Sequence, residues 1–248
     1  MRGFKAFAFA AAASLLLAGS LQAQQTGLFK WMGVSGAHSR YSTYSTGAGA
    51  QDIYRSPYRA QFDMGGGFGP TVDIFCVDFA HGSNTGTYGA SFTNLGSDAG
   101  SLGTTTRSAS LQQYLETAFL ANEMVTTTGF TATTASARED QLRVIQGAMW
   151  EILYGAPIYY QAQSGSWLHS AIATWRTRAV TGAAGMNPYE WTVVDQRTQN
   201  QQGQWVVGAS QEYLTRVQVT PEPATLLLLG TGLLATLMAA GALRRSAV

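Results

Sequence analysis

Residues 71–79 read TVDIFCVDF, and this stretch is rich in β-branched and aromatic side chains. Such side chains fit the pleated surface of a sheet, so the stretch predicts a β-strand. Apolar residues stand at odd and at even positions, which is typical of a central strand that is buried on both faces. The glycine-rich segment 64–70 before it predicts a turn. Residues 24–70 are otherwise polar, and the Tyr/Ser/Thr run at 41–46 predicts an edge strand or a loose arm.

Two helices are predicted after a second stretch rich in Gly, Ser and Thr. Apolar residues recur at helical spacing from about residue 108 to residue 125, and Ser108 or Ser110 would suit the N-cap. The second helix is predicted to begin at Ser136, which forms the capping box S-x-x-E with Glu139. A glycine followed by a proline is expected to end this helix.

The chain beyond these helices predicts one shorter helix and further strands. The helix is expected around 167–180, and the strands are expected at 189–195, 204–207 and 213–219. The predicted fold class is therefore α+β: a β-sandwich or barrel-like sheet with a helical insertion at about 108–180. We expect this insertion to bring the second helix against the central strand.

Composition excludes several classes of function. Charged residues are 12% of the chain and hydrophobic residues 46%, so the composition of a disordered protein is absent. Residues 24–219 contain eleven basic and thirteen acidic side chains, which excludes a basic nucleic-acid interface. A single cysteine excludes an internal disulfide framework. One cysteine and three scattered histidines match no metal-ligand spacing, so neither a metal nor a cofactor is expected.

The N-terminus predicts export. Residues 1–23 have the pattern of a signal peptide, in which Arg2 and Lys5 precede an apolar run. The run ends at Leu21-Gln22-Ala23, a suitable cleavage site with a small residue last. The alternative is a permanent N-terminal anchor.

The C-terminus contains three elements in a fixed order. Pro221-Glu222-Pro223 is followed by the mostly apolar residues 224–243 and then by Arg244 and Arg245. Twenty such residues are enough for one transmembrane helix. The arginines favour a cytoplasmic tail, which places the preceding domain outside the membrane. The prolines favour an extended, exposed backbone, as a processing site requires.

Together, these elements resemble the PEP-CTERM sorting signal, which would occupy residues 220–248 after a domain at 24–219. The resemblance implies a precursor anchored in the inner membrane of a Gram-negative bacterium. It also implies exosortase as a partner, with cleavage near Pro221-Glu222-Pro223 and release to the cell surface or the extracellular matrix. The alternative is a plain membrane anchor.

Cys76 and Gln146 are the residues whose chemistry is unusual for their positions. Gln146 lies four residues after Leu142 and four before Trp150, so it shares the apolar face of the second helix. A buried carboxamide without partners costs about 1–3 kcal/mol, so a specific partner is expected. Considered singly, Gln146 is also consistent with a satisfied buried hydrogen bond, and Cys76 with an inert buried thiol.

Two short motifs give these residues a joint interpretation. Phe-Cys-Val-Asp at 75–78 and Ile-Gln-Gly-Ala-Met-Trp at 145–150 resemble the motifs of the thioester domain of bacterial surface adhesins. That family pairs an aromatic-Cys motif on a strand with a Φ-Q-x-x-Φ-W motif on a helix. The resemblance covers about residues 70–155, and it implies that an internal thioester joins Cys76 to Gln146.

The residue types fit this chemistry. A thiolate is the strongest ordinary side-chain nucleophile, and a carboxamide carbon held against it can lose ammonia to form a thioester. An incoming amine would then attack the former Gln146 carbonyl and expel the Cys76 thiolate. The chain would act once as a covalent adhesin rather than as an enzyme. The target amine remains open among a protein lysine, an amino sugar and a polyamine.

Three further residues are candidates for a supporting role. Trp150 completes the helix motif, Asp78 is two residues from the cysteine, and His81 is near enough in sequence to serve as a base. A structural turn contact is the alternative for Asp78. Residues 24–219 contain one lysine, Lys30, against ten arginines, and lysine scarcity would protect the thioester from self-reaction. A genomic preference for arginine codons is the alternative explanation.

Two other functions compete with the covalent adhesin. The first is a non-reactive surface or matrix protein in which Cys76 and Gln146 are merely packed. The second is a cysteine hydrolase that uses Cys76, His169 and Asp195. The mid-strand position predicted for the cysteine disfavours the hydrolase, because such nucleophiles favour helix N-termini that lower the thiol pKa.

Overall fold

The computed structural model describes most of the chain between residues 25 and 217. The described residues are 25–34, 42–45, 50–53, 57–79, 81, 86–126, 134–155, 166–199, 201–202, 205–207, 211–217, 232 and 236. The predicted signal peptide lies outside them, as does the predicted membrane helix apart from two isolated positions. Among the described residues, no helix is long and apolar enough to cross a membrane. The elements below belong to the first of the two units of the chain, Met1–Gln218.

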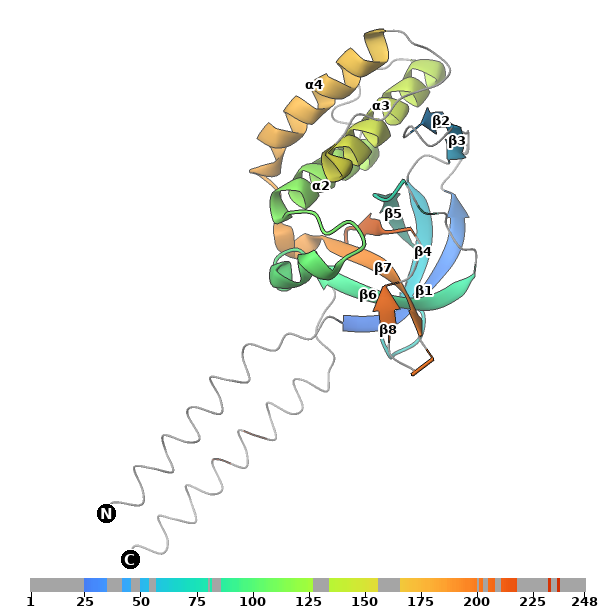
Figure 1. Cartoon of the computed structure of the whole chain (residues 1–248), viewed down its shortest axis with the longest axis vertical. Helices are drawn as coiled ribbons and strands as arrows, with labels where there is room; N and C mark the ends of the chain where they lie inside the picture. The colour runs from blue at the N-terminus through green and yellow to red at the C-terminus, as the bar shows by residue number, and fades with distance from the viewer. Residues whose placement is uncertain are drawn as a thin grey trace, which may run out of the picture. The chain divides into compact units, whose positions relative to one another are not determined.

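Six antiparallel strands close into a barrel (Figure 1). Hydrogen-bonded neighbours follow the order β6-β1-β4-β5-β9-β7, and β7 pairs with β6 to complete the ring. A further strand, β8, pairs with the far end of β7. Among the described strands, each of the six in the ring has a neighbour on both sides, while β8 forms an edge of the sheet. The strands are β1 (Gln25–Val34), β4 (Tyr58–Asp63), β5 (Val72–Cys76), β6 (Thr87–Asn94), β7 (Thr192–Gln199), β8 (Trp205–Val207) and β9 (Tyr213–Thr215).

The barrel confirms the barrel-like sheet and the central position of the predicted 71–79 strand. This strand is β5, which ends at Cys76 and lies between β4 and β9. By contrast, the sequence did not predict β1, which pairs with β4 and β6 along most of its length. A Cβ at Gly27 would lie 2.4 Å from the main-chain oxygen of Asp63, so close packing requires glycine there. Glycine weakens the strand pattern in the sequence, although here it allows the strands to approach.

Aromatic rings fill the barrel. Phe29 is completely buried and stacks between Tyr88 and Tyr213, with ring centroids 4.6 and 5.4 Å away. Phe62 and Phe92 meet edge to face at 5.2 Å. These aromatic side chains come from β1, β4, β6 and β9, so their shared burial holds the closed barrel together.

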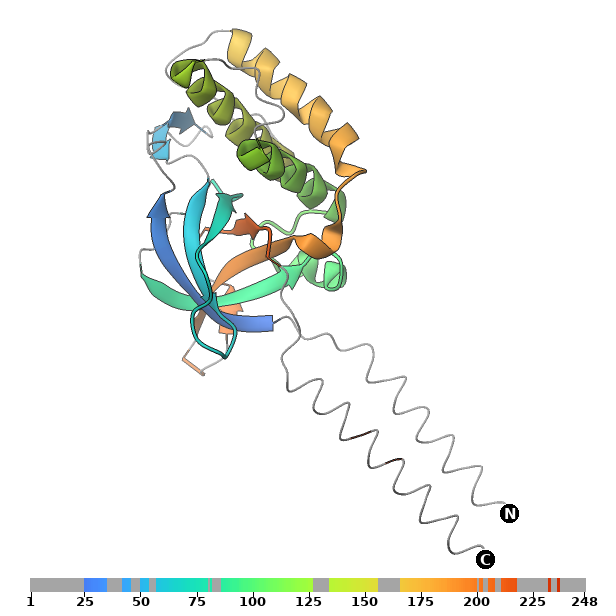
Figure 2. The same ribbon diagram turned by 180° about the vertical axis from the view of Figure 1, so that it is seen from behind.

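Three helices form a layer at one end of the barrel, as Figures 1 and 2 show from opposite sides. They follow β6 and precede β7 in the chain and pack against one another, which confirms the predicted helical insertion. Short 3₁₀ helices, η1 (Ala99–Thr104) and η2 (Pro188–Glu190), lie at either side of this insertion in the sequence. Separately, β2 (Ser42–Ser45) and β3 (Ala50–Ile53) form a two-stranded antiparallel sheet. The three long helices are α2 (Leu111–Thr126), α3 (Ala135–Tyr154) and α4 (Ser166–Ala183).

The helix ends agree in part with the predicted caps. Before α2, the Ser110 hydroxyl accepts from the Gln113 amide at 3.3 Å, while Gln113 Oε1 accepts from the Ser110 amide at 3.0 Å. The predicted N-cap of α3, Ser136, was wrong. The N-cap is Thr134, and Ser136 is the second residue of the helix. Thr134 Oγ1 accepts from the Ala137 amide at 3.2 Å. Gly155 ends α3 in the left-handed region with φ 66°, as predicted.

The strands beyond the helices also differ from the prediction at their ends. A strand was expected at 189–195, but residues up to Glu190 form η2 and β7 begins at Thr192. Pro188 favours this turn because its ring fixes φ, and Asn187 caps it through its side chain. The predicted 213–219 strand is shorter, since β9 ends at Thr215.

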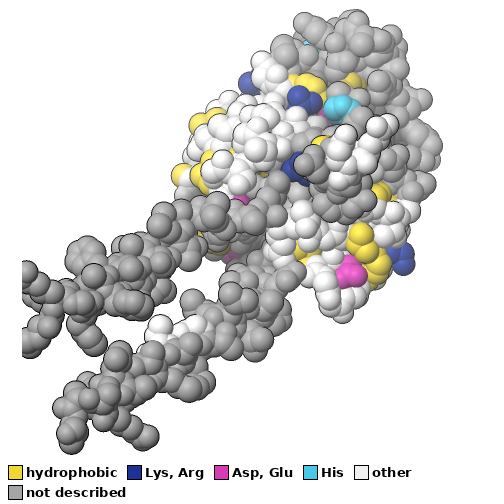
Figure 3. All heavy atoms as spheres, turned by 60° about the horizontal axis from the view of Figure 1, so that its bottom comes forward, with side chains coloured by type: hydrophobic (Ala, Val, Ile, Leu, Met, Phe, Trp, Pro, Cys, Tyr) yellow, Lys and Arg dark blue, Asp and Glu magenta, His cyan; other side chains and the backbone are white. Residues whose placement is uncertain are grey.

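Charged side chains are scattered over the face in Figure 3 rather than gathered in one patch.

Candidate functional site

Cys76 ends β5 inside the fold. Its side chain is completely buried, and it pairs with Tyr213 of β9 in the antiparallel register. Val77 continues the contact with the opposite segment, because its amide donates to the main-chain oxygen of Glu212 at 3.1 Å. The strand that the sequence predicts therefore places a thiol where water is excluded.

Gln146 meets Cys76 from the helical layer. It lies on the buried face of α3 with Leu142, Met149 and Trp150. Its Nε2 donates a hydrogen bond to the main-chain oxygen of Cys76 at 2.9 Å, across seventy positions of the chain. Both side chains are fully buried. The structure therefore supplies the specific partner that a buried carboxamide requires.

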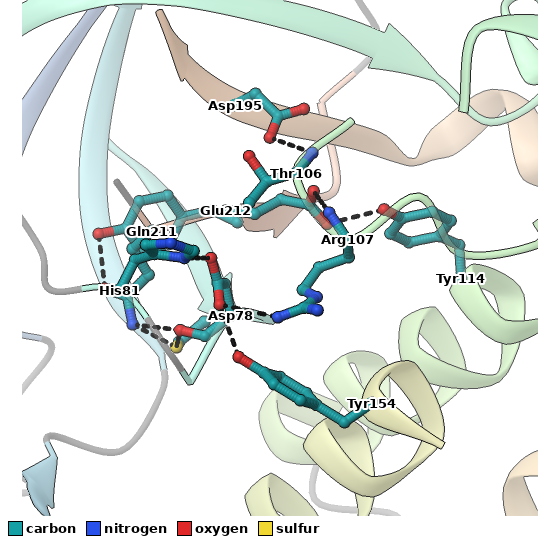
Figure 4. A network of polar contacts seen from close by, with 11 residues as sticks. Asp78, His81, Thr106, Arg107, Tyr114, Tyr154, Asp195, Gln211 and Glu212 are labelled. Carbon is teal, nitrogen blue, oxygen red and sulfur yellow. Dashed lines mark hydrogen bonds and ion pairs between the residues drawn. The ribbon is translucent and has the colours of Figure 1, made fainter. Parts of the chain in front are cut away.

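The sulfur of Cys76 has its own set of polar contacts (Figure 4). Gln211 Nε2 donates to Sγ at 2.6 Å, and the thiol donates to the main-chain oxygen of Asp78 at 3.4 Å. The side chain of Trp150 also lowers the pKa of the thiol. Trp150 is itself fixed by burial and by an edge contact with Phe79, with ring centroids 5.0 Å apart.

The electrostatic surroundings of the thiol oppose its ionisation. Burial raises the pKa of Cys76 strongly, and the nearby negative charge of Asp78 raises it further. Hydrogen bonds from Trp150 and Gln211 lower the same pKa, but they do not overcome burial. A free Cys76 thiol is therefore neutral at physiological pH.

Asp78 is the centre of a charged cluster next to the thiol. Its buried carboxylate accepts from Tyr154 Oη at 2.7 Å and from Arg107 Nη1 at 3.2 Å. The His81 Nδ1 atom lies 2.5 Å from the other carboxylate oxygen. The guanidinium of Arg107 also lies over the ring of Tyr154, 3.8 Å from its centroid. His81 is one-third exposed, so the cluster leads from the buried cysteine toward solvent.

Asp195 and Glu212 form a buried carboxyl pair on the barrel side of the helical layer (Figure 4). The amide of Thr106 donates to Asp195 at 2.9 Å, and the amide of Arg107 donates to Glu212 at 2.9 Å. Tyr114 of α2 donates its hydroxyl to the other Glu212 oxygen at 2.8 Å. Burial raises the pKa of both carboxyls, and the charge of Asp195 adds to the rise at Glu212. Protonation of the pair is therefore easier than protonation of ordinary carboxyls in water.

The structure brings together five residues that the sequence singles out. Gln146 contacts the main chain of Cys76, and Trp150 lowers the pKa of its thiol. Asp78 contacts the thiol through its main-chain oxygen and binds His81 through its carboxylate.

Three residues of the site were not predicted from the sequence. Tyr154 follows Trp150 by four positions, so the helical period alone could have placed it on the same face. Gln211 and Arg107 stand in polar segments outside any motif. Only the pairing of β5 with β9 and the path of the chain into α2 reveal them.

The residues proposed for a hydrolase lie in different surroundings. His169 lies on α4 with an exposed side chain, whereas Cys76 is completely buried. Asp195 belongs to the carboxyl pair with Glu212. Within the described part of the chain, no group of three His, Cys, Asp or Glu side chains could hold a metal ion.

Comparison with known proteins adds information on sorting. The family model of the PEP-CTERM protein-sorting motif matches residues 219–245. No curated protein matches the chain. Among solved structures, the chain is similar to the N-terminal domain of the Streptococcus pyogenes pilus tip adhesin Cpa. That similarity has a TM-score of 0.37 and 11% identity, and it covers 81% of this chain and 97% of the other. The chain thus ends in a PEP-CTERM sorting motif, which marks an exported protein that exosortase processes at the membrane for the cell surface.

Proposed function

We propose that this exported protein forms an internal thioester between Cys76 and Gln146 and uses it to bond covalently to amines on a target. The observation that carries the proposal is the contact of the Gln146 carboxamide with the main-chain oxygen of Cys76, at 2.9 Å between two fully buried residues. A strand end and a helix face thereby bring together the two residues that would supply the nucleophile and the electrophile. Correct orientation of such groups removes about 7–11 kcal/mol of barrier, so the cross-link would need no separate enzyme.

Formation of the thioester is a simple exchange. The Cys76 sulfur adds to the side-chain carbonyl carbon of Gln146, the carbon–nitrogen bond breaks, and ammonia leaves with the thiol proton. Glutamine suits this step better than glutamate, because a carboxylate carbon is a poor electrophile and its charge would be buried. The reaction requires neither an oxidant nor a cofactor.

The surroundings favour survival of the thioester until a target arrives. Full burial of Cys76 and Gln146 keeps bulk water from the acyl carbon. Lys30 is the single lysine of residues 24–219, and its ammonium lies 5.5 Å from the centroid of the Phe68 ring, in the segment between β4 and β5. Arginine side chains stay protonated and are poor nucleophiles. The attacking amine is therefore expected from another molecule: a protein lysine, an amino sugar or a polyamine.

The location of the reaction follows from the sorting motif. We propose that residues 224–243 anchor the precursor in the inner membrane of a Gram-negative bacterium before exosortase acts at Pro221-Glu222-Pro223. The processed domain would then reach the cell surface or the extracellular matrix. There, one coupling event per molecule would attach it to an amine-bearing partner.

Intact mass of the purified protein tests the proposal. The thioester makes the chain lighter than its sequence predicts by one ammonia. Methylamine then adds its whole mass, which leaves the product one methylene heavier than the uncross-linked chain and frees one thiol. Peptide mapping should find the methylamide at Gln146. A methylamide at Gln211, the other glutamine beside the thiol, would contradict the proposed pair.

Matched variants complete the test. Cys76→Ser and Gln146→Glu should each show the mass of an uncross-linked chain and take up no methylamine. An unshifted wild-type mass, with a thiol that reacts only after unfolding, would overturn the proposal. That result would favour a non-reactive surface protein, the alternative supported by the full burial and raised pKa of the Cys76 thiol.

A further inference from the structure

Gln211 holds its amide nitrogen against the one thiol of the chain. Its Nε2 lies 2.6 Å from Sγ of Cys76, although the two residues are 135 positions apart in the sequence. Gln211 stands directly before β9, and β9 pairs with β5, so the barrel register brings the carboxamide to the thiol. The side chain is almost completely buried.

Two further hydrogen bonds fix the orientation of this carboxamide. Nε2 also donates to the main-chain oxygen of Asp78 at 3.0 Å, and Oε1 accepts from the hydroxyl of Tyr213 at 2.9 Å. A main-chain carbonyl can only accept, so the nitrogen of Gln211, and not its oxygen, must face Asp78 and the sulfur. The chain therefore aims a preorganised N–H donor at the reacting atom.

We infer that Gln211 is a catalytic residue of the proposed coupling reaction, in which its N–H stabilises the departing thiolate of Cys76. This inference rests on the proposed function. In the step itself, the amine nitrogen bonds to the Gln146 carbonyl carbon, and the carbon–sulfur bond breaks with its electron pair going to sulfur. The proton lost by the amine finally neutralises the sulfur, which gives an amide and a thiol.

A donor is needed because sulfur would otherwise leave as an isolated charge in the interior. Burial disfavours the thiolate, as the raised pKa of Cys76 reflects, and the carboxylate of Asp78 adds repulsion. A fixed N–H aimed at the atom where negative charge develops offsets both effects without reorganisation during the reaction.

The same geometry argues against Gln211 as the acyl group of the thioester. Its amide nitrogen is the atom that lies against the sulfur, and the same nitrogen is held by the main-chain oxygen of Asp78. Gln211 is thus placed to donate to the sulfur rather than to present its carbonyl carbon to it.

The test compares the rates at which full-length protein that carries the thioester takes up methylamine. The increase in intact mass over time measures each rate. Gln211→Met removes the donor while it keeps an uncharged side chain of similar length. Tyr213→Phe removes only the hydroxyl that orients Gln211. Gln112→Met, at an exposed position of α2, is the matched control. The expected uptake by Gln211→Met is slower by about 100-fold, in line with loss of one preorganised donor, with a smaller decrease for Tyr213→Phe.

The outcomes separate this inference from the proposed function. Wild-type protein that lacks the ammonia loss would overturn both. Wild-type protein with the ammonia loss, together with uptake by Gln211→Met at the rate of Gln112→Met, would overturn the role of Gln211 alone. If Gln211→Met does not fold, as judged by its thermal transition, Tyr213→Phe decides: slowed uptake with an unchanged unfolding midpoint supports the role, and an unchanged rate overturns it.

Discussion

Gln146 donates its side-chain N–H to the main-chain oxygen of Cys76 across 2.9 Å, which joins the helical layer to the barrel at one buried point. The contact depends on two regular features. β5 carries the cysteine to the end of a central strand, and α3 presents the glutamine on its buried face. The surrounding Asp78 and Gln211 then hold the sulfur from the barrel side.

Opening the proposed thioester should reduce stability. The cross-link closes a loop of seventy residues, and loop-closure entropy predicts a loss of about 4 kcal/mol when it is opened. Urea unfolding before and after methylamine treatment measures this difference. In Cys76→Ser, which cannot form the thioester, methylamine should leave the midpoint unchanged. An equal midpoint in treated and untreated wild-type protein would show that no such loop is closed.

Removing the Asp78 carboxylate should destabilise the protein. Asp78→Ala leaves Arg107, His81 and Tyr154 without their shared acceptor, and we expect a cost of about 3 kcal/mol. Asp78→Asn keeps one acceptor oxygen and should cost less. The control is Asp140→Ala, at an exposed position of α3. Equal unfolding free energies for Asp78→Ala and Asp140→Ala would contradict the central role of Asp78.

The carboxyl pair of Asp195 and Glu212 predicts a loss of stability as the pH rises above the ordinary carboxyl range. Both pKa values are raised in the folded state, chiefly by burial, so the folded pair binds a proton more tightly than the unfolded chain does. Its stabilising contribution is complete below the ordinary carboxyl pKa and is lost as pH rises through the raised values. The free energy of unfolding should therefore fall as the pH rises from the ordinary carboxyl pKa through the raised pKa values.

Asp195→Asn tests the origin of this pH dependence. An asparagine can still accept from the Thr106 amide, but it does not titrate and places no negative charge beside Glu212. The fall in unfolding free energy with pH should become smaller in Asp195→Asn, whereas Asp140→Asn should follow the wild type. Parallel pH curves for Asp195→Asn and the wild type would refute the assignment.

The α3 cap offers a test of helix energetics away from the thiol. Thr134→Ala removes the side chain that accepts from the Ala137 amide, and we expect a loss of about 1 kcal/mol. Ser136→Ala, inside the helix, should change stability by less. Chemical denaturation of both variants decides between the cap observed in the structure and the S-x-x-E box read from the sequence.

The sequence predicts the Cys76 and Gln146 side of the site because local patterns suffice there. β-branched and aromatic residues identify the strand, and a 3.6-residue period places Gln146 on the buried face of α3. Gln211 and Glu212 depend instead on the pairing of β5 with β9, which no local pattern encodes. Residues 27–34 read GLFKWMGV and carry apolar and aromatic side chains that are typical of a strand, but the glycines at 27 and 33 weaken the pattern, and β1 was not predicted.

The position of β9 as the final barrel strand also sets the order of events during biosynthesis. The ribosome produces Cys76 long before Gln211, and β5 obtains its second neighbour only when residues 213–215 have been made. Pairing of such distant segments is a late and slow step of folding. A nascent or truncated chain therefore keeps an unsheltered thiol, and the chemistry of this sulfur begins only once nearly the whole domain has been synthesised.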